Sequence, residues 1–127
     1  GRVTLACYLH DVTAGRLLAN QGFTVAQADW RRAAHKCADL VYSRLSGQGA
    51  FLDTRVVYVA ESGPKTNRVK RIAIMDSDGS NHRYLTAGKA VVTMPRFSPR
   101  GDRLVYTGML ARKPRVFVLD IASARIR

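Results

Sequence analysis

Three histidines are the side chains in this sequence of 127 residues that could act as general acids or bases near neutral pH. His10, His35 and His82 are scattered, and no Ser-His-Asp order or G-x-S-x-G elbow accompanies them. No glycine-rich phosphate loop is present either. The sequence therefore predicts a protein that is not an enzyme, with no catalytic residues and no cofactor.

The possible metal ligands are not spaced for a metal site. Cys7 and Cys37 lie 30 positions apart, without a C-x-x-C pair. Both fall at apolar positions, so we interpret them as buried small hydrophobic residues. Whether they pair depends on geometry that the sequence does not give. Asp76 and Asp78 lack further spaced oxygen ligands, and we interpret them as turn residues.

The first 50 residues change their hydrophobic period midway. Apolar runs at 3–9 and 17–25, joined by a turn at 11–15, predict a β-hairpin. From residue 28 the period becomes helical, with Asp29 at the start and Gly47 at the end. The predicted apolar face holds Trp30, Ala34, Cys37, Val41 and Leu45, and the residues predicted to lie off it are Arg31, Arg32, His35 and Asp39. We interpret His35 as a surface or boundary residue. This section reads as β-β-α, followed by a linker at 46–50.

The pattern after the linker is purely β and repeats. "RVVYVAE" at 55–61 recurs as "RLVYTGM" at 103–109, an offset of 48, and "RIAIMD" at 71–76 recurs as "RVFVLD" at 115–120, an offset of 44. This interval is typical of four-stranded propeller blades. Turns are expected at 76–79 and 98–101. The predicted strands are 55–60, 69–76, 82–86, 93–97, 103–108 and 114–120, and we expect no outer strand after the last of them.

The net charge of +12 raises nucleic acid as a partner. Residues 51–127 carry 15 basic and 6 acidic side chains, a net +9, concentrated in "KTNRVKR" and "ARKPR". Aromatic residues that could stack on bases are not interleaved with these groups. We therefore predict a solvated basic surface without specific nucleic-acid binding. No apolar run reaches the roughly 18 residues that a membrane span requires, so no transmembrane segment is predicted.

Three segments carry a resemblance to a known family. "ADWRRAAHKCADLVYSRLSG", "VVYVAESGPKTNRVKRIAIMDSDGSNHRYLT" and "PRFSPRGDRLVYTG" resemble, in this order, the TolB family of the Tol-Pal system of Gram-negative envelopes. The resemblance implies an N-terminal α/β domain, similar to anticodon-binding domains, and a six-bladed β-propeller. Residues 1–50 would be the C-terminal part of the first domain and 51–127 the start of the propeller. The chain would then be an interior piece of a longer protein: an α+β remnant followed by about one and a half blades.

The family pattern differs from this sequence at two turns. Arg100 replaces the aspartate of the usual Ser-Pro-Asp-Gly turn. Ala124 stands where a turn glycine is typical, which disfavours a left-handed backbone there. These differences concern the turns and leave the resemblance intact.

The resemblance also implies a function as a periplasmic protein-interaction scaffold that supports outer-membrane integrity and constriction at cell division. Its partners would be a Pal-like peptidoglycan-associated lipoprotein and inner-membrane Tol proteins, the latter through an N-terminal tail that this chain lacks. The predicted partner-binding residues are Val92, Thr93, Met94 and Arg96, in a loop at 91–96 that leads into an inner strand. Two alternatives stay open. A nucleic-acid module would show salt-sensitive RNA binding, and the propeller of a serine peptidase would accompany a hydrolase domain with a G-x-S-x-G elbow.

Overall fold

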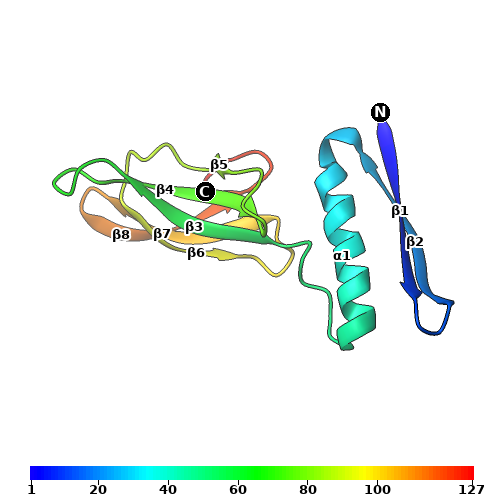
Figure 1. Ribbon diagram of the computed structural model, residues 1–127. Coiled ribbons are helices and arrows are strands. Elements are labelled where there is room, and N and C mark those ends of the chain that lie inside the picture. Colours follow the sequence, from blue (N-terminus) through cyan, green and yellow to red (C-terminus); the bar gives the residue numbers. More distant parts are fainter. The chain divides into compact units, whose positions relative to one another are not determined.

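The computed structural model describes residues 1–127, which form two compact units, 1–54 and 55–127 (Figure 1). The first unit contains one helix and a two-stranded sheet, and the second contains two three-stranded sheets. All three sheets are antiparallel. The expected class, an α+β remnant followed by a partial β-propeller, is confirmed.

The first unit is a hairpin packed on a helix, as the sequence predicted. Strands β1 (Arg2–Asp11) and β2 (Arg16–Ala26) pair antiparallel, and a short 3-10 turn, η1 (Gln27–Asp29), leads into helix α1 (Trp30–Ser46). Gly47 ends the helix with φ +70°, and its N–H donates to the carbonyl oxygen of Ser43 at 3.0 Å. Glycine is favoured at this position because the helix ends in a left-handed backbone conformation, which a Cβ would make sterically unfavourable.

The predicted apolar face of α1 is wrong at its ends. Trp30 and Leu45 are exposed, whereas Ala33 and Asp39 are buried. A two-stranded hairpin offers too little surface to cover five helical turns, so the terminal apolar residues stay in contact with water. Asp39 is buried because backbone N–H groups satisfy its carboxylate, a feature that hydrophobic periodicity cannot detect.

Cys7 and Cys37 form a disulfide that joins β1 to α1. Cys7 is buried, as predicted, whereas Cys37 is half-buried, and the pairing that the sequence left open is a disulfide. The hairpin and the helix bring two residues from distant sequence positions to a Cα–Cα distance of 5.7 Å, which lies within the range of disulfides. The bond therefore ties the two elements of the first unit together.

The second unit consists of two sheets built from consecutive strands. The first sheet contains β3 (Arg55–Ser62), β4 (Val69–Asp76) and β5 (Arg83–Tyr84). The second contains β6 (Val92–Phe97), β7 (Arg103–Leu110) and β8 (Lys113–Asp120). The expectation that no outer strand follows β8 is wrong in part, because Ile126 forms a β-bridge with Leu119.

The two sheets repeat each other in register. Arg55 pairs with Asp76 in the first sheet, and Arg103 pairs with Asp120 in the second, at the predicted offsets of 48 and 44. The third strand follows the same rule. Arg83 pairs with Ile74, and Arg127 exchanges two backbone hydrogen bonds with Val118, at 2.8 and 3.0 Å. The repeat predicted from the sequence is therefore a structural repeat.

The core of the second unit lies between the two repeats. Its buried side chains are Ile72, Ile74 and Leu85 from the first repeat and Val92, Leu104, Tyr106, Leu119 and Ile121 from the second. The opposite face of the second repeat is not covered, and Val105, Val116 and Val118 are exposed on it. Each sheet thus buries one face against its neighbour, which is how stacked repeats gain stability.

Two short segments differ from the predictions. The strand predicted at 82–86 contains only two residues, because the Thr86 hydroxyl replaces a backbone acceptor and receives the N–H of Ile72 at 2.9 Å. Ala124 adopts a left-handed backbone with φ +54°, so the expectation that alanine disfavours this conformation at the turn is not met. At the other turn, the N–H of Gly101 donates to the carbonyl oxygen of Ser98 at 2.9 Å, as predicted, with Arg100 in place.

Candidate partner-binding site

The four predicted partner-binding residues lie on strand β6 and not on a loop. Val92, Thr93, Met94 and Arg96 belong to the strand, and pairing extends one residue further, because Met109 N–H donates to the carbonyl oxygen of Val91 at 2.9 Å. The predicted loop at 91–96 is therefore wrong. Val91 and Val92, which precede the predicted start of the inner strand at residue 93, pair with the end of β7, so β6 begins earlier than predicted.

A β-bulge interrupts β6 at Met94 and Pro95. Thr93 pairs with Thr107 and Arg96 pairs with Val105, so two residues of β6 face one residue of β7. Proline has no N–H to donate to a sheet and is commonly found at such bulges. Met94 adopts φ +52°, and its side chain is 68% exposed. The bulge thus directs a flexible apolar side chain into solvent.

Val92 differs from the other three predicted residues because its side chain is only 4% exposed and belongs to the core. A partner could not contact it without opening the packing between the repeats. Met94 and Arg96 are exposed and Thr93 is half-buried. The structure therefore leaves these three side chains accessible, and their contact with a partner stays a prediction.

A small cavity lies beside the start of β6. Its volume is about 200 Å³, and the residues that line it are Thr86, Ala87, Gly88, Lys89, Ala90, Val92, Tyr106 and Ile126. Gly88 adopts φ +80°, and a Cβ built there would lie 2.6 Å from Cγ1 of Val69. A glycine is therefore required where this connection passes β4. Burial raises the pKa of the Tyr106 phenol, consistent with a packing role.

The three histidines do not form a common site. His10 lies on β1, and His82 packs edge-on against Tyr84 with ring centroids 5.0 Å apart. His35 Nδ1–H donates to the carbonyl oxygen of Leu52 at 3.0 Å. No three His, Cys, Asp or Glu side chains lie close enough together to hold a metal ion. Asp76 ends β4 and Asp78 lies in the turn that follows, where Ser80 N–H donates to Asp78 Oδ1 at 2.9 Å.

Asp39 is a buried anchor that the sequence reasoning missed. Its Oδ1 accepts the backbone N–H groups of Phe51 at 2.8 Å and Leu52 at 2.7 Å, and its Oδ2 accepts that of Asp53 at 2.9 Å. Burial raises the pKa of this carboxyl, but the three N–H donors and the nearby His35 outweigh that effect and lower the pKa overall. The sequence signal that could have indicated this burial was an acidic residue, Asp39, between the apolar Ala38 and Leu40 in the middle of a helix.

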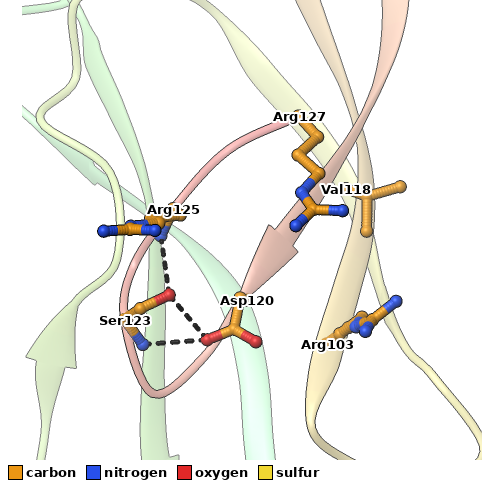
Figure 2. Close-up of a pocket in the computed structure, with 6 residues that line it drawn as sticks. All are labelled: Arg103, Val118, Asp120, Ser123, Arg125 and Arg127. Atoms are coloured by element: carbon orange, nitrogen blue, oxygen red, sulfur yellow. Dashed lines mark hydrogen bonds between the residues drawn. The ribbon is translucent and has the colours of Figure 1, made fainter.

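The second repeat carries an arginine-lined groove at its C-terminal end (Figure 2). The residues that line it are Arg103, Val118, Asp120, Ser123, Arg125 and Arg127, around a volume of about 160 Å³. Asp120 Oδ1 accepts the backbone N–H of Ser123 at 2.9 Å and its hydroxyl at 2.8 Å. These hydrogen bonds lower the pKa of Asp120. The groove therefore combines one ionised carboxylate with three cationic side chains.

No helix of the structure has both the length and the apolar composition needed to cross a bilayer. This finding applies to α1, whose 17 residues include five charged side chains.

Comparisons with known proteins agree with this architecture. The family model of the TolB beta propeller domain matches residues 42–127. The chain is 57% identical over 123 residues to Tol-Pal system protein TolB 1 of Novosphingobium aromaticivorans, and 50% identical over 127 residues to Tol-Pal system protein TolB of Zymomonas mobilis. The matches cover 97% and 100% of this chain but 27% and 28% of those relatives.

A solved structure shows the same fold. The crystal structure of TolB from Acinetobacter baumannii superposes with a TM-score of 0.84 at 18% sequence identity, covering 99% of this chain and 35% of that one. At this identity the likeness concerns the fold alone. The family model nevertheless spans both β repeats and the end of α1. This chain belongs to the TolB β-propeller family.

Proposed function

We propose that this chain is part of a non-enzymatic, periplasmic scaffold of the Tol-Pal system. The observation that carries the proposal is the match to relatives named Tol-Pal system protein TolB, at 57% and 50% identity along nearly the whole chain. In this proposal residues 1–50 belong to the N-terminal α/β domain and 51–127 begin the propeller. The scaffold supports outer-membrane integrity and constriction at cell division.

The disulfide between Cys7 and Cys37 supports the periplasmic assignment. Disulfides form and persist in oxidising compartments, including the bacterial periplasm, and are rare in the cytosol. The bond joins the hairpin to helix α1, and a two-stranded hairpin alone would pack on the helix only weakly. A protein that depends on such a bond suits an envelope location.

The proposed mechanism is non-covalent binding, in which a Pal-like lipoprotein contacts the propeller and inner-membrane Tol proteins contact an N-terminal tail of the longer protein. On this chain, Met94 and Arg96 offer an exposed apolar side chain next to an exposed cation. Thr93 completes the proposed contact surface, and Val92 supports it from the core. The names of the relatives favour this role over the nucleic-acid and peptidase alternatives.

A pull-down between the full-length parent protein and its own Pal tests this proposal. We expect capture by the wild-type protein and weaker capture by Met94→Asp and Arg96→Glu, because both changes alter the exposed surface of β6. Arg100→Glu is the matched control, since Arg100 is an exposed arginine in the adjacent turn. Failure of the wild-type parent to capture Pal would contradict the Tol-Pal role. Equal losses from Arg96→Glu and Arg100→Glu would contradict the assigned surface.

A further inference from the structure

One end of the second unit is formed by two hairpin tips and one connection. The β3–β4 tip lies at 63–68 and the β7–β8 tip at 109–113, and both lie at the same end of the unit (Figure 1). The connection at 87–91 leads from β5 to β6 and also lies there, because Met109 N–H donates to the carbonyl oxygen of Val91 at 2.9 Å. We call these three segments the basic end.

Exposed cations are concentrated at the basic end. All three segments contribute to them, and they are Lys65, Arg68, Lys89, Arg112 and Lys113. The carboxylate nearest to these segments in the chain is that of Glu61, whose Oε1 lies 2.7 Å from Nζ of Lys70. Because this ion pair cancels its own charge, the five cations give the basic end a net charge of +5.

The remaining acidic residues of the second unit all lie at its other end. They terminate β4 and β8 or lie in the turns beside β4 and β7, and they are Asp76, Asp78, Asp102 and Asp120. The positive charge of this unit is therefore polarised along its strands. A polarised charge favours one orientation when the unit approaches an anionic partner.

Apolar side chains are exposed among the cations of the basic end. Leu110 is 52% exposed, Val91 48% and Met109 39%. Leu110 pairs with Lys113 across the β7–β8 tip, so an apolar side chain and a cation stand side by side where the chain reverses. Such a combination suits a boundary between polar headgroups and hydrocarbon, where cations remain at the surface and apolar groups enter it.

The turn at the β7–β8 tip presents Arg112 at a cost in backbone strain. Ala111 and Arg112 have φ +50° and +63°. Hairpin turns with two positive φ values normally use Asn-Gly or a similar pair, because side chains with a Cβ disfavour this backbone. Strained residues of this kind cluster at functional sites. The exposed arginine at this turn is therefore a candidate contact residue.

A phospholipid surface fits this chemistry better than a nucleic acid does. Phosphate headgroups attract clustered Lys and Arg side chains over about one Debye length, and an apolar side chain adds to the binding by entering the bilayer boundary. A nucleic acid would be bound more strongly with aromatic rings that stack on its bases, but no Phe, Tyr or Trp lies in the three segments.

We propose that the basic end binds the surface of a membrane rich in anionic phospholipid. Arg112 and Lys113 contact phosphate groups from the β7–β8 tip, and Lys65 and Arg68 do so from the β3–β4 tip. Leu110 enters the boundary between headgroups and acyl chains. The binding is peripheral and reversible. It requires no Tol-Pal partner, so this proposal and the proposed function can fail independently.

Vesicle flotation with the full-length parent protein tests this proposal. The vesicles contain phosphatidylcholine alone or an equal mixture of phosphatidylcholine and phosphatidylglycerol. We expect binding to the anionic vesicles that weakens as the salt concentration rises, and little binding to the neutral ones. Arg112→Gln/Lys113→Gln should weaken binding roughly twentyfold, because each cation near an anionic surface contributes about a factor of five.

Arg100→Gln/Arg125→Gln is the matched control, because it removes the same charge from exposed positions at the other end of the unit. This control is expected to change vesicle binding by less than about twofold. Leu110→Ser should weaken vesicle binding roughly threefold and leave binding to poly-L-glutamate unchanged, because only the vesicle has an apolar layer.

Three results would overturn the proposal. The first is an absence of binding to the anionic vesicles at low salt. The second is an equal loss of binding in the two double variants, which would show that net charge alone is responsible. The third is binding to poly-L-glutamate or single-stranded RNA that is at least as strong as binding to the vesicles, which would assign the basic end to another class of anionic partner.

Discussion

The two units of the chain are stabilised by different chemistry. The first unit contains one helix and one hairpin, joined by the Cys7–Cys37 disulfide, and the buried carboxylate of Asp39 on the helix anchors the segment that follows it. The second unit has no disulfide and depends on apolar packing between two repeats in the same register. A small unit that cannot bury enough surface needs covalent and polar anchors, whereas a repeat array gains stability from each neighbour that stacks on it.

Removal of the disulfide is expected to have the largest effect and to act on the first unit alone. A cross-link between residues 30 apart contributes roughly 3–4 kcal/mol in the loop-entropy estimate. The double variant Cys7→Ala/Cys37→Ala should therefore lower the free energy of unfolding of this unit by about that amount. Fluorescence of Trp30, the single tryptophan, reports its unfolding. Loss of the second unit's hydrogen-exchange protection in the same variant would contradict the separation of the two units.

Equivalent positions of the two repeats are expected to differ sharply in their sensitivity to truncation. Ile72→Ala should cost about 3 kcal/mol, because Ile72 is fully buried between the repeats. Val116→Ala at the equivalent position should cost about 0.5 kcal/mol or less, because Val116 is largely exposed. Urea unfolding followed by circular dichroism measures both. Similar costs at the two positions would show that the face of the second repeat is already covered.

Loss of the Asp39 charge is expected to destabilise the first unit by about 2 kcal/mol, because a buried hydrogen-bonded carboxylate is replaced by a weaker acceptor. The measurement compares Asp39→Asn with Asp29→Asn, an exposed acid at the start of the same helix. Trp30 fluorescence during thermal unfolding follows both variants. Equal stability of the two variants would count against the anchor.

The same carboxylate makes the first unit sensitive to acid. The pKa of Asp39 is lower in the folded protein than its ordinary value of 3.8. A lowered folded pKa adds stability above the unfolded pKa, and this stability is lost as the pH falls through the folded pKa. The wild-type unit should therefore lose stability below about pH 4, and Asp39→Asn should lose less. Parallel pH profiles for the two proteins would contradict the assignment.

The smallest expected effect concerns the turn after β8. Ala124→Gly should stabilise the second unit by about 1 kcal/mol, because a left-handed backbone strains alanine but not glycine. Ala122→Gly, two residues earlier, is the control, because Ala122 does not have a positive φ. Differential scanning calorimetry can resolve the two changes. Destabilisation by Ala124→Gly would exclude backbone strain as the relevant property of this turn.

Sequence reasoning predicted the hairpin, the helix and the repeat because these depend on local periodicity. The offsets of 48 and 44 between strands reappear as identical pairing of Arg55 with Asp76 and of Arg103 with Asp120. Gly47 was also predictable, since helices often end at a left-handed glycine. These features depend on residues that are close in the sequence or on patterns that occur twice.

The candidate site was predicted less well because it depends on contacts between distant residues. The burial of Val92 is determined by packing between the two repeats, and the exposure of Met94 by a bulge that pairing with β7 defines. The Cys7–Cys37 bond and the burial of Asp39 likewise need the tertiary arrangement of the first unit. Charge and hydrophobicity alone placed Asp39 in solvent, because its backbone partners lie 12 to 14 residues further along the chain.

The central claim is that the second unit is an open segment of a repeat array, with apolar faces that further repeats would cover. Sedimentation velocity of the 127-residue chain at micromolar concentration tests this claim most directly. Uncovered faces such as that of Val116 and Val118, together with unpaired strand edges, predict self-association that increases with protein concentration. The longer parent protein is expected to sediment as a monomer. A cooperative, monodisperse monomer of the isolated chain across this concentration range would contradict the account.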